Sequence, residues 1–529
     1  MRFGHLDGGL RCENGAVKAA DLPVRYNAVD VLERNLRERA DKVALVSEAR
    51  TLTFADMVAE VDRVGHALAG LGVRRGDTVA ILALDSAEWV ATYFAVIKLG
   101  GIAASFNTLL TAAEFEFMLN DCGARVVVVD GSLLATVESI RSRLEWLEHV
   151  VVIGGTGHAH HDYARLVAAA PGTPLVAVRT HRDDACCLNY SSGTTGEPKG
   201  ILHAHKDLPL TAELVGVRTL GLRADDRTFA VAKLFFTFGT GGNLIFPFWA
   251  GASIVVYPGS PRQARNVLAV IDRFQPTVFY TAPTGYASML AESAMARDWN
   301  LSSLRLCVSA GESLPAPIWQ RWKQATGLEI IDGIGSTENY HIFISNRPGD
   351  VRAGSSGRPV DGYEVRIADE AGGDVAPGQV GNLMVRGETA ALFYLHQYGR
   401  SQRTFQGEWL DTGDKYSVDQ DGYYWHAGRS DDMLKVGGIW VSPVEVESCL
   451  LAHADVVECA VIGHADLDGL VKPKAFVVLG VDASRERVSE RLVEHCAARM
   501  ATYKRPRWIE VVVELPKTAT GKVQRFRLR

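Results

Sequence analysis

Residues 190–200 read YSSGTTGEPKG and follow a strand-like run, CCLNY, at 186–190. The stretch contains two serines, two threonines, three glycines and Lys199. Glycines let backbone N–H groups approach phosphate oxygens closely, and hydroxyl groups add further donors. A lysine supplies positive charge beside the phosphates. The order of these residues predicts a phosphate-binding loop that begins at the end of a strand.

This loop differs from the Walker A type, in which the lysine directly follows the second glycine of GxxxxGK[ST]. Here Gly193 and Gly196 are too close together, and Lys199 is followed by Gly200. A short run of Ser, Gly and Thr on its own is more often a polar hairpin. The full order SSGTTGxPKG is much more restrictive, and it favours phosphate binding.

The chain before this loop alternates between strand-like and helix-like runs. We expect strands at 78–84, 102–106 and 124–131, and helices at 86–100 and 111–123. Such alternation is typical of α/β folds with parallel sheets, and continuous apolar strands fit a sheet covered on both faces. Beyond the loop, further strands are expected at 229–235, 252–259, 277–284 and 303–311.

From about residue 350 glycine and proline become frequent, and 364–370 and 381–388 resemble shorter antiparallel strands. A domain boundary is expected near 428–438, where glycines flank a charged cluster. This divides the chain into residues 1–430 and residues 431–529. In the second part we expect helices at 444–453 and 487–500, and strands at 456–464, 472–480 and 508–516. The predicted fold is a large α/β domain followed by a small α+β domain.

The composition narrows the class of protein. Of 529 residues, 47% are hydrophobic and 22% charged, which excludes a disordered or fibrous chain. The formal net charge is −6, which argues against a broad nucleic-acid-binding surface. The long apolar region 229–256 is interrupted by Lys233, glycines and Pro247, so it predicts buried strands and loops instead of a membrane span.

The first 20 residues contain no apolar run that resembles a signal peptide. The eight cysteines include no CxxC pair, so neither a zinc site nor a disulfide framework is predicted. A reducing compartment is the simple interpretation. We therefore expect a cytoplasmic protein whose partners are neither nucleic acids nor membranes.

Three further segments carry groups suited to nucleotide chemistry. DGIGSTE (332–338) presents Thr337 and Glu338 after a strand, and a carboxylate beside phosphates suits Mg²⁺, which prefers oxygen ligands. WLDTGD (409–414) places Asp411 and Asp414 around a turn, where a carboxylate either caps the turn or binds ribose hydroxyls. PKTATGKVQR (516–525) is either a solvated basic tail or a loop that inserts one lysine into another domain's site.

Together, in this order and at these separations, the segments resemble the ANL superfamily of adenylate-forming enzymes from about residue 25 onward. Within it they are similar to the benzoate-type aryl-CoA ligases. The resemblance is carried by residues 233–239, 333–360, 428–448 and 516–529. It implies an ATP-dependent acid–CoA ligase in which a carboxylate first forms an acyl-adenylate with release of pyrophosphate. CoA then displaces AMP and forms a thioester.

The resemblance also implies a role for each matching residue. The large domain would include a small β-barrel-like part, and the small domain would be mobile about a hinge at Asp431. Glu338 would coordinate Mg²⁺, and Lys522 would reach in from the small domain to bridge the carboxylate and the α-phosphate. The remaining nucleotide contacts would come from Ser191, Ser192, Thr194, Thr195 and Lys199 (β- and γ-phosphates), Thr337 (α-phosphate), Gly311, Glu312 and Asp332 (adenine), and Asp414 and Arg429 (ribose).

After adenylation, the small domain would swing and bring residues 435–440, with Lys435, to the site. Gly437 and Gly438 would then let the pantetheine arm of CoA pass closely. Most relatives carry serine-glycine where this chain has Gly437 and Gly438. This departure affects the fit of the thioester-forming state.

The acid-binding pocket is expected to be apolar. Relatives that activate amino acids place an aspartate early in this pocket to pair with the substrate ammonium, and residues 235–239 contain no acid. An aromatic carboxylic acid is therefore favoured. The expected pocket residues are Phe236, Thr237, Phe238, Gly239, Gly285, Tyr286, Ile334, Gly335, His341 and Ile342, although each aromatic side chain among them also suits the core.

Two departures from the benzoate ligases affect the size of this pocket. Thr237 and Phe238 stand where alanine and tyrosine are common and would crowd one side, whereas Gly285 replaces a large apolar residue and would open another. A hydroxy- or aminobenzoate, or a bulkier ring acid, therefore fits as well as benzoate. His341 would then either bind a ring substituent or pack.

Two alternatives to a CoA ligase remain. The acyl group would go to a separate carrier protein, or only the first half-reaction would occur. A regulator on a degenerate ligase scaffold is disfavoured, because Lys199, Thr337, Glu338, Asp414 and Lys522 are all present. The sequence predicts neither the acid nor the oligomeric state.

Overall fold

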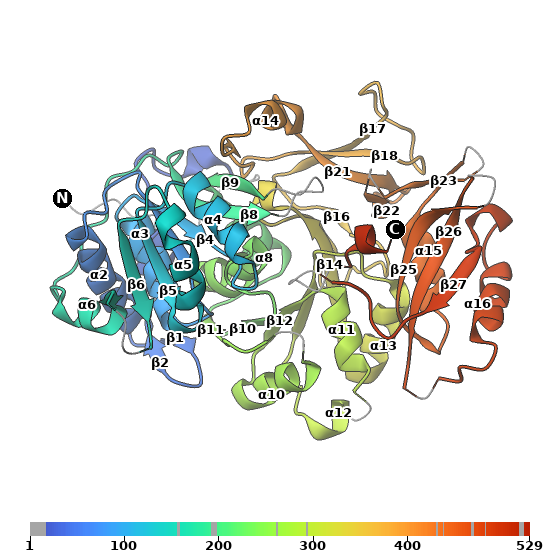
Figure 1. The fold of residues 1–529 in the computed structure, drawn as a ribbon, viewed down its shortest axis with the longest axis horizontal. Helices are drawn as coiled ribbons and strands as arrows, with labels where there is room; N and C mark the ends of the chain where they lie inside the picture. Colours follow the sequence, from blue (N-terminus) through green and yellow to red (C-terminus); the bar gives the residue numbers. More distant parts are fainter. Residues whose placement is uncertain are drawn as a thin grey trace.

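The structure, a computed structural model, describes residues 17–155, 159–191, 198–260, 263–292, 295–429, 432–436, 439–466, 470–481, 483–517 and 523–528. A large N-terminal part contains two mainly parallel sheets and one antiparallel sheet, and a small α+β part follows at the C-terminal end (Figure 1). This confirms the predicted mixed α/β class and the order of a large and a small domain. The seven cysteines among the described residues are free thiols.

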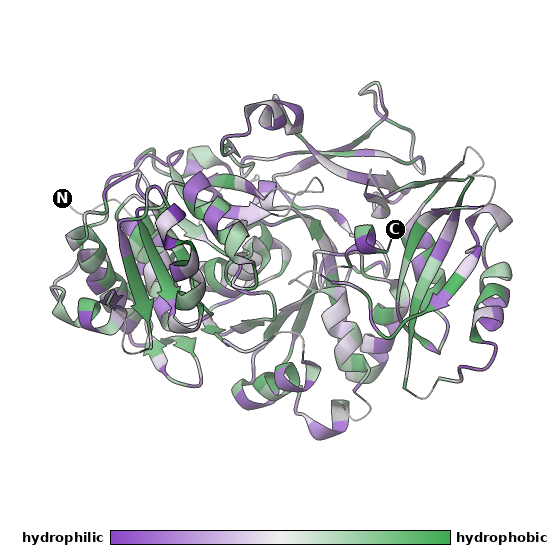
Figure 2. Ribbon diagram, viewed as in Figure 1, coloured by the Kyte–Doolittle hydropathy of each residue, from purple (hydrophilic) through white to green (hydrophobic). Residues whose placement is uncertain are grey.

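The first sheet has eight strands in the order β19-β9-β8-β4-β3-β5-β6-β7. Alternate side chains of its central strands enter two different cores, because successive residues of a strand point to opposite faces. Val126 and Val128 pack with α2 and α3, whereas Val127 and Val129 pack with α4 and α5. Figure 2 shows β5 and β6 as almost continuously apolar. The strands are β3 (Thr78–Leu82), β4 (Ile102–Ser105), β5 (Val126–Asp130), β6 (His149–Ile153), β7 (His161–Asp162), β8 (Ala185–Ser191), β9 (Lys199–Ala204) and β19 (Phe393–Tyr394).

Helices cover both faces of this sheet, as predicted for a buried parallel sheet. Two of them begin with a side-chain cap, in which Thr111 and Ser86 accept from the backbone N–H groups of Glu114 and Trp89. The helices of this region are α1 (Asp30–Glu33), α2 (Phe54–Gly70), α3 (Ala87–Lys98), α4 (Ala112–Asp121), α5 (Leu134–Ile140) and α6 (Tyr163–Ala169), with the short helices η1 (Ala19–Asp21), η2 (Arg34–Leu36), η3 (Gly131–Leu133) and η4 (Arg141–Arg143).

The second sheet has nine strands in the order β16-β15-β14-β13-β12-β10-β11-β1-β2. Its central strands β11, β10, β12, β13 and β14 are parallel, so their carboxyl ends meet at one edge. In open α/β sheets this edge is where ligands bind. The strands are β1 (Val43–Val46), β2 (Thr51–Thr53), β10 (Arg227–Ala230), β11 (Ser253–Val255), β12 (Val278–Thr281), β13 (Leu306–Ser309), β14 (Ile330–Gly335), β15 (Ile342–Ser345) and β16 (Arg358–Pro359).

One face of this sheet packs against α10, α11 and α13, and the other against the helices that precede β10 and β11. The helices are α7 (Asp207–Thr211), the π-helical η5 (Ala212–Thr219) and η6 (Gly241–Ile245), α8 (Thr237–Thr240), α9 (Phe246–Ala250), α10 (Ala264–Phe274), α11 (Pro283–Leu290), α12 (Met295–Asp298), α13 (Ala316–Thr326) and η7 (Thr337–Asn339).

The prediction for the apolar region 229–256 was partly wrong. It contains β10 and β11 at its ends, but residues 237–250 form α8, η6 and α9 instead of strands and loops. Leu244, Phe246 and Phe248 are fully buried. A helix that is buried on all sides is apolar all round, so its sequence lacks the polar stripe that distinguishes a helix from a strand.

The third sheet of the large part is antiparallel. It has five strands, in the order β17-β18-β21-β20 with β22 paired to β21 (Figure 1). The strands predicted at 364–370 and 381–388 are present in it. The elements are β17 (Glu364–Ala368), β18 (Gly381–Arg386), α14 (Tyr398–Thr404), β20 (Phe405–Gln406), β21 (Trp409–Val418) and β22 (Tyr424–Arg429).

The small C-terminal part has a three-stranded sheet, β25-β26-β27, flanked by α15 and α16 (Figure 1). The strand expected at 508–516 is shorter, because β27 pairs with β26 only as far as Val511 and Val513 is 90% exposed. The elements are β23 (Leu434–Val436), β24 (Ile439–Val441), α15 (Pro443–Leu451), β25 (Val456–Ala465), β26 (Val471–Leu479), α16 (Val488–Ala497), η8 (Thr502–Lys504), β27 (Trp508–Val511) and η9 (Arg525–Arg527). Among the described residues, we find no helix with the length and apolar character needed to span a bilayer.

Candidate active site

Thr337 and Glu338 lie in η7, the turn that connects β14 to the antiparallel β15. Ser336 precedes this turn and accepts a hydrogen bond from the backbone N–H of Asn339 at 3.3 Å. The turn lies at the carboxyl end of β14, where the sequence placed it. Because β9 and the segment before β19 also contact this turn, residues from both parallel sheets meet here.

Lys199 and Glu338 form an ion pair at the centre of the site. The ammonium of Lys199 donates to Glu338 Oε1 at 2.5 Å, and the hydroxyl of Tyr394 donates to the same oxygen at 2.8 Å. Burial by itself raises the pKa of Glu338, but the Lys199 charge and the two hydrogen bonds outweigh it and lower the pKa. Glu338 is therefore a carboxylate at neutral pH. Sequence reasoning missed Tyr394, which comes from β19, far along the chain.

The expected adenine-binding residues lie on the neighbouring strands. Gly311 and Glu312 follow β13, and Gly311 has a φ of +95°, which a glycine adopts without strain. Asp332 lies on β14 and is buried, and burial raises the pKa of its carboxyl group to about 8. Its Oδ1 has no hydrogen-bond partner. A protonated or unpaired carboxyl oxygen of this kind is available to an amino or ring-nitrogen group of a ligand.

Asp414 and Arg429 face each other on β21 and β22, which pair in antiparallel register at these two residues. Arg429 Nη1 donates to Asp414 Oδ1 at 3.2 Å, and His426 Nε2 lies 3.7 Å from the same oxygen. The side chain of Asp414 is only 12% exposed, whereas that of Arg429 is 47% exposed. The structure thus brings together the two residues expected at the ribose.

His341, one of the residues expected in the acid pocket, is packed among aromatic side chains. Its ring lies 5.4 Å from the ring of Phe238 and 4.5 Å from that of Phe246. Burial lowers the pKa of His341 to about 3, so the imidazole is neutral. Nε2 is 3.3 Å from the carbonyl oxygen of Phe238, which only accepts, so the proton is on Nε2. Nδ1 is then a buried acceptor, and it has no partner in the structure.

The other expected pocket residues divide between the site and the core. Ile334, Gly335 and Ile342 flank η7 on β14 and β15, and Phe236, Thr237 and Gly239 lie at or in α8. Tyr286 is fully buried, donates to the carbonyl of Val308 and packs on Trp322. Of the two roles left open for Tyr286, packing in the core accounts for all of these contacts.

Gly285 does not leave the open space that was expected. A Cβ atom at this position would lie 2.1 Å from Thr281 Oγ1, so the hydroxyl of Thr281 already occupies that space. The side chain of Thr281 thus fills the space that a side chain at residue 285 would need. This contact was not predicted from the sequence, because it depends on how the chain turns from Thr281 into the first turn of α11.

Comparison with known proteins decides the family. Residues 32–395 match the family described as AMP-binding enzyme, and residues 445–522 match its C-terminal domain. The chain belongs to the AMP-binding enzyme family. It is 46% identical to the benzoate–CoA ligase of Thauera aromatica, over 97% of each chain.

Solved structures agree with this assignment to the AMP-binding enzymes. The anthranilate CoA ligase AuaEII, solved in complex with anthranoyl-AMP, is 60% identical and superposes with a TM-score of 0.94, over 97% of this chain and 98% of that chain. A benzoate CoA ligase from Burkholderia xenovorans LB400 is 40% identical, with a TM-score of 0.88 over 95% of this chain and 100% of that chain.

Several residues expected to act in this AMP-binding enzyme lie outside the described residues. These are Ser192, Thr194, Thr195, Asp431, Gly437, Gly438 and Lys522. Ser191 ends β8 opposite Lys199, and its buried Oγ has no partner. The backbone of Lys435 pairs with Trp440 between β23 and β24.

The small domain of this AMP-binding enzyme approaches the adenine side of the site. Arg525, in η9, donates two hydrogen bonds of 2.8 Å to the carboxylate of Glu447. The charge of Glu447 is the main cause of the raised pKa of Arg525, and the charge of Glu312 makes a smaller contribution. Figure 1 shows η9 and the C-terminus on the side of the small domain that faces the large one. The segment that follows Lys522 is therefore close to the loop that carries Glu312.

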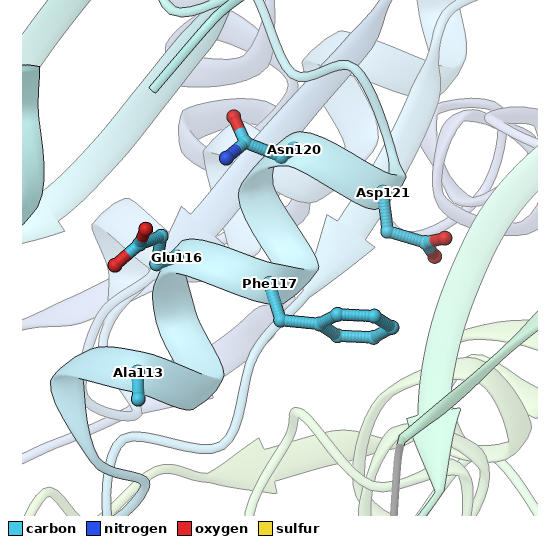
Figure 3. A pocket seen from close by; sticks show the side chains of 5 residues that line it. All are labelled: Ala113, Glu116, Phe117, Asn120 and Asp121. Atoms are coloured by element: carbon cyan, nitrogen blue, oxygen red, sulfur yellow. The ribbon is translucent and has the colours of Figure 1, made fainter. Parts of the chain in front are cut away.

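A separate surface depression of about 570 Å³ lies along α4. Figure 3 shows the side chains that line it, among them Glu116, Asn120 and Asp121. Glu116 pairs with Arg143 at 2.8 Å, Asn120 binds the backbone of residues 143 and 145, and Asp121 accepts from Tyr190 at 2.6 Å. Because each of these polar groups already has a partner within the protein, we assign no ligand to this surface.

Proposed function

We propose that this enzyme converts 2-aminobenzoate, or a benzoate with a similar ring donor, to its CoA thioester with ATP. The broader class is established by the family: the chain is an AMP-forming acyl–CoA ligase of the aryl type. The finer choice of acid rests on the neutral imidazole of His341 and its unpaired Nδ1.

An apolar pocket that contains one buried acceptor discriminates between ring acids. Benzoate has no donor for Nδ1, so the nitrogen loses its hydrogen bond to water and gains none, which costs about 1–3 kcal/mol. A ring amine or hydroxyl supplies the missing donor. The 60% identity to a ligase solved with anthranoyl-AMP supports the amine. His341 lies between α8 and the turn η7, and this position supports a contact with a ring whose carboxylate faces the phosphates.

We propose that the enzyme promotes the first half-reaction by neutralising the negative charges of the two reacting groups. A carboxylate must approach the α-phosphate of ATP, so cations and oriented donors have to offset the repulsion between them. In this assignment Lys199 leaves Glu338 and binds the β- and γ-phosphates, while Thr337 donates to the α-phosphate. Asp332 and Glu312 border the adenine, and Asp414 with Arg429 holds the ribose.

Glu338 fits a magnesium ion, because Mg²⁺ is usually held by one or two carboxylates together with substrate phosphates. The described residues contain no group of three or more potential ligands, which agrees with a site that the nucleotide completes. When bound there, the ion would neutralise phosphate charge. The carboxylate of Glu338 is already ionised and needs only to separate from Lys199.

We assign to the small domain a role in each half-reaction. Lys522 would act on the adenylation step, and the charge interaction between Arg525 and Glu312 supports an approach of the small domain to the adenine side of the site. A hinge at Asp431 would divide residues 1–430 from 431–529. Movement about it would bring Lys435, Gly437 and Gly438 to the site for transfer to CoA.

The decisive experiment measures pyrophosphate release with a panel of acids, with and without CoA, and follows AMP and thioester by mass spectrometry. The panel contains benzoate, the three aminobenzoates, the hydroxybenzoates and bulkier ring acids. We expect kcat/KM for 2-aminobenzoate to exceed that for benzoate by about tenfold or more, as for one buried hydrogen bond. Equal or better use of benzoate would contradict the choice of acid. Adenylate without thioester would instead favour delivery to a carrier protein.

A further inference from the structure

The backbone of η7 is fixed by three donors from outside the turn. His203 Nε2 donates to the carbonyl oxygen of Thr337 at 2.7 Å, and the backbone N–H of Ala391 donates to that of Glu338 at 2.7 Å. The hydroxyl of Thr389 donates to the carbonyl of Asn339 at 3.1 Å. Each carbonyl of the turn thus has a partner on a different part of the fold. Only one of the three donors is an ionisable side chain.

His203 lies on β9, four residues after Lys199 and on the same face of the strand. Lys199 therefore binds the side chain of the turn η7, and His203 binds its backbone. His203 is completely buried, and so is Asp207, whose Oδ2 lies 2.9 Å from His203 Nδ1. One strand thus carries both the phosphate-loop lysine and a contact to the turn that presents Thr337 and Glu338.

The hydrogen-bond partners of His203 determine its protonation. A carboxylate and a carbonyl oxygen both only accept, so both ring nitrogens must donate and the ring is an imidazolium. Burial alone lowers the pKa of His203, but the hydrogen bond and charge of Asp207 outweigh it and raise the pKa. Asp207 Oδ2 also accepts from the backbone N–H of Ala204 at 2.9 Å, which fixes the carboxylate. Donors of this charged kind make the stronger hydrogen bonds.

Tyr340, the residue after η7, adopts an uncommon backbone conformation with φ of +68°. A non-glycine residue keeps such a conformation only where its surroundings enforce it. The ring of Tyr340 packs edge-on against the ring of His203, with 5.2 Å between their centroids. His203 thus contacts the strained turn twice, through the carbonyl of Thr337 and through the ring of Tyr340.

We propose that His203, held by Asp207, is a positioning residue that fixes the turn carrying Thr337 and Glu338 for adenylate formation. This inference rests on the proposed function, in which the two residues of the turn bind the α-phosphate and the metal. His203 acts through the turn and does not touch the substrate. A misplacement of catalytic groups by about 1 Å can lower the rate about a hundredfold. A charged hydrogen-bond donor that fixes the turn would therefore have a large effect on the rate of adenylate formation.

His203→Ala and His203→Gln test this proposal, with His205→Gln as the matched control. His205 is also a fully buried histidine, and it contacts the backbone of Ala28 instead of η7. Glutamine at 203 keeps a donor near the position of Nε2. For each variant we would measure ATP–pyrophosphate exchange, KM for the aromatic acid, the Kd of AMP by calorimetry, and the melting temperature.

We expect His203→Ala to lower kcat for exchange by about 10- to 100-fold and to weaken AMP binding, while KM for the acid changes less than about twofold. His203→Gln should recover much of the lost rate. His205→Gln should lose stability but keep its exchange rate. A purely structural role for His203 would make the two histidine positions equivalent.

Normal exchange and normal AMP binding in His203→Ala would overturn the proposal. An equal loss of exchange in His205→Gln would do the same. If His203→Ala does not fold, Asp207→Asn replaces it, because loss of the carboxylate removes the partner that keeps His203 charged. The same fall in exchange is then expected, and normal exchange in Asp207→Asn would overturn the proposal. Failure of the proposed function has a different signature, because the wild-type protein would then form no adenylate from any aromatic acid. The calorimetric Kd of AMP still reports on the turn in that case.

Discussion

A carboxyl group enclosed by protein loses the water that stabilises its charge, and Asp332 shows this effect at the scale of one residue. Its pKa is raised to about 8, so the folded protein holds a proton that the unfolded chain releases near pH 4. Folding then binds a proton across this range. The free energy of unfolding therefore falls as the pH rises from about 4 to about 8, and it levels off above that.

Asp332→Asn should remove this pH dependence, because an amide does not ionise. We expect the variant to lose less stability than the wild-type protein between pH 6 and pH 8. Urea unfolding at several pH values measures this slope. The exposed Asp225→Asn is the control and should retain the wild-type slope. Parallel curves for wild type and Asp332→Asn would show that Asp332 is already ionised in the folded protein.

His341 offers a second test at this scale, on specificity. His341→Leu replaces the imidazole and its unpaired acceptor with an apolar side chain of similar size. The kcat/KM for benzoate should therefore rise relative to that for 2-aminobenzoate. We expect the ratio of their kcat/KM values to fall by about tenfold, the worth of one buried hydrogen bond. His341→Asn retains an acceptor near the position of Nδ1 and should preserve more of the ratio. An unchanged ratio in His341→Leu would assign His341 to packing alone.

The sequence placed individual residues well where a local motif carried them. Thr337 and Glu338 follow a strand, and the stretch that contains Ser191 begins at the end of one, as the motifs indicated. It missed His203 and Tyr394, because their contacts to η7 join segments more than fifty residues apart. The alternation of β9, in which residues 199, 201 and 203 share a face, was the available signal for His203.

At the scale of elements, α8 lies unusually close to the backbone of residues 232 and 233. A Cβ atom at Gly239 would lie 2.1 Å from the carbonyl oxygen of Lys233 and 2.5 Å from that of Ala232. These are backbone atoms and cannot rotate away. The helix that carries Thr237 and Phe238, two residues of the proposed acid pocket, therefore needs glycine at this position.

Gly239→Ala should destabilise the protein by about 1–3 kcal/mol, as for other substitutions that overpack a core. It should also raise KM for the aromatic acid, since α8 carries residues of the proposed acid pocket. Gly70→Ala is the matched control, because it lies at the exposed end of α2 with nothing within 4 Å of its new Cβ. There the same change should stabilise by about 0.4–1 kcal/mol. Urea denaturation of both variants compares them, and equal effects would refute the close approach.

The elements that sequence periodicity predicted were those with a regular local pattern. The strands at 78–84 and 124–131 and the helices at 86–100 and 444–453 are present. Residues 237–250 were assigned wrongly because a segment buried on all sides has no polar face from which to read a period. The strand at 508–516 was overextended because its length depends on a partner, β26, that pairs only as far as Val511.

At the scale of the whole molecule, adenylation and thioester formation are assigned to two arrangements of one pair of domains. Lys522→Ala should slow adenylate formation by about 10²–10³-fold, comparable to the loss of other charge-stabilising groups. Thioester formation from preformed adenylate should be largely spared. Rapid-quench assays of the two steps separate these effects, and equal losses would contradict the domain movement.

Gly438→Trp should give the reverse pattern, because a bulky side chain would obstruct the path of pantetheine. Thioester formation should fall while pyrophosphate release persists. Transfer to CoA at the wild-type rate in this variant would remove the proposed role of residues 435–440. Opposite effects of these two variants on the two half-reactions would also support a mobile domain that begins near residue 431.

Lys199 and Glu338 form an ion pair, and the turn η7 is anchored to β9 and to residues 389–391. The pocket helix α8 and its neighbours depend on other contacts, such as the one between the Leu234 N–H and Asp85. The part proposed to handle phosphate and the part proposed to select the acid are thus held mainly by different contacts, and His341, which lies 3.3 Å from the carbonyl oxygen of Phe238, links them. New substrates can be acquired by changes around α8 while the phosphate apparatus is inherited intact, so one ancestral scaffold can diversify in specificity without first losing its chemistry.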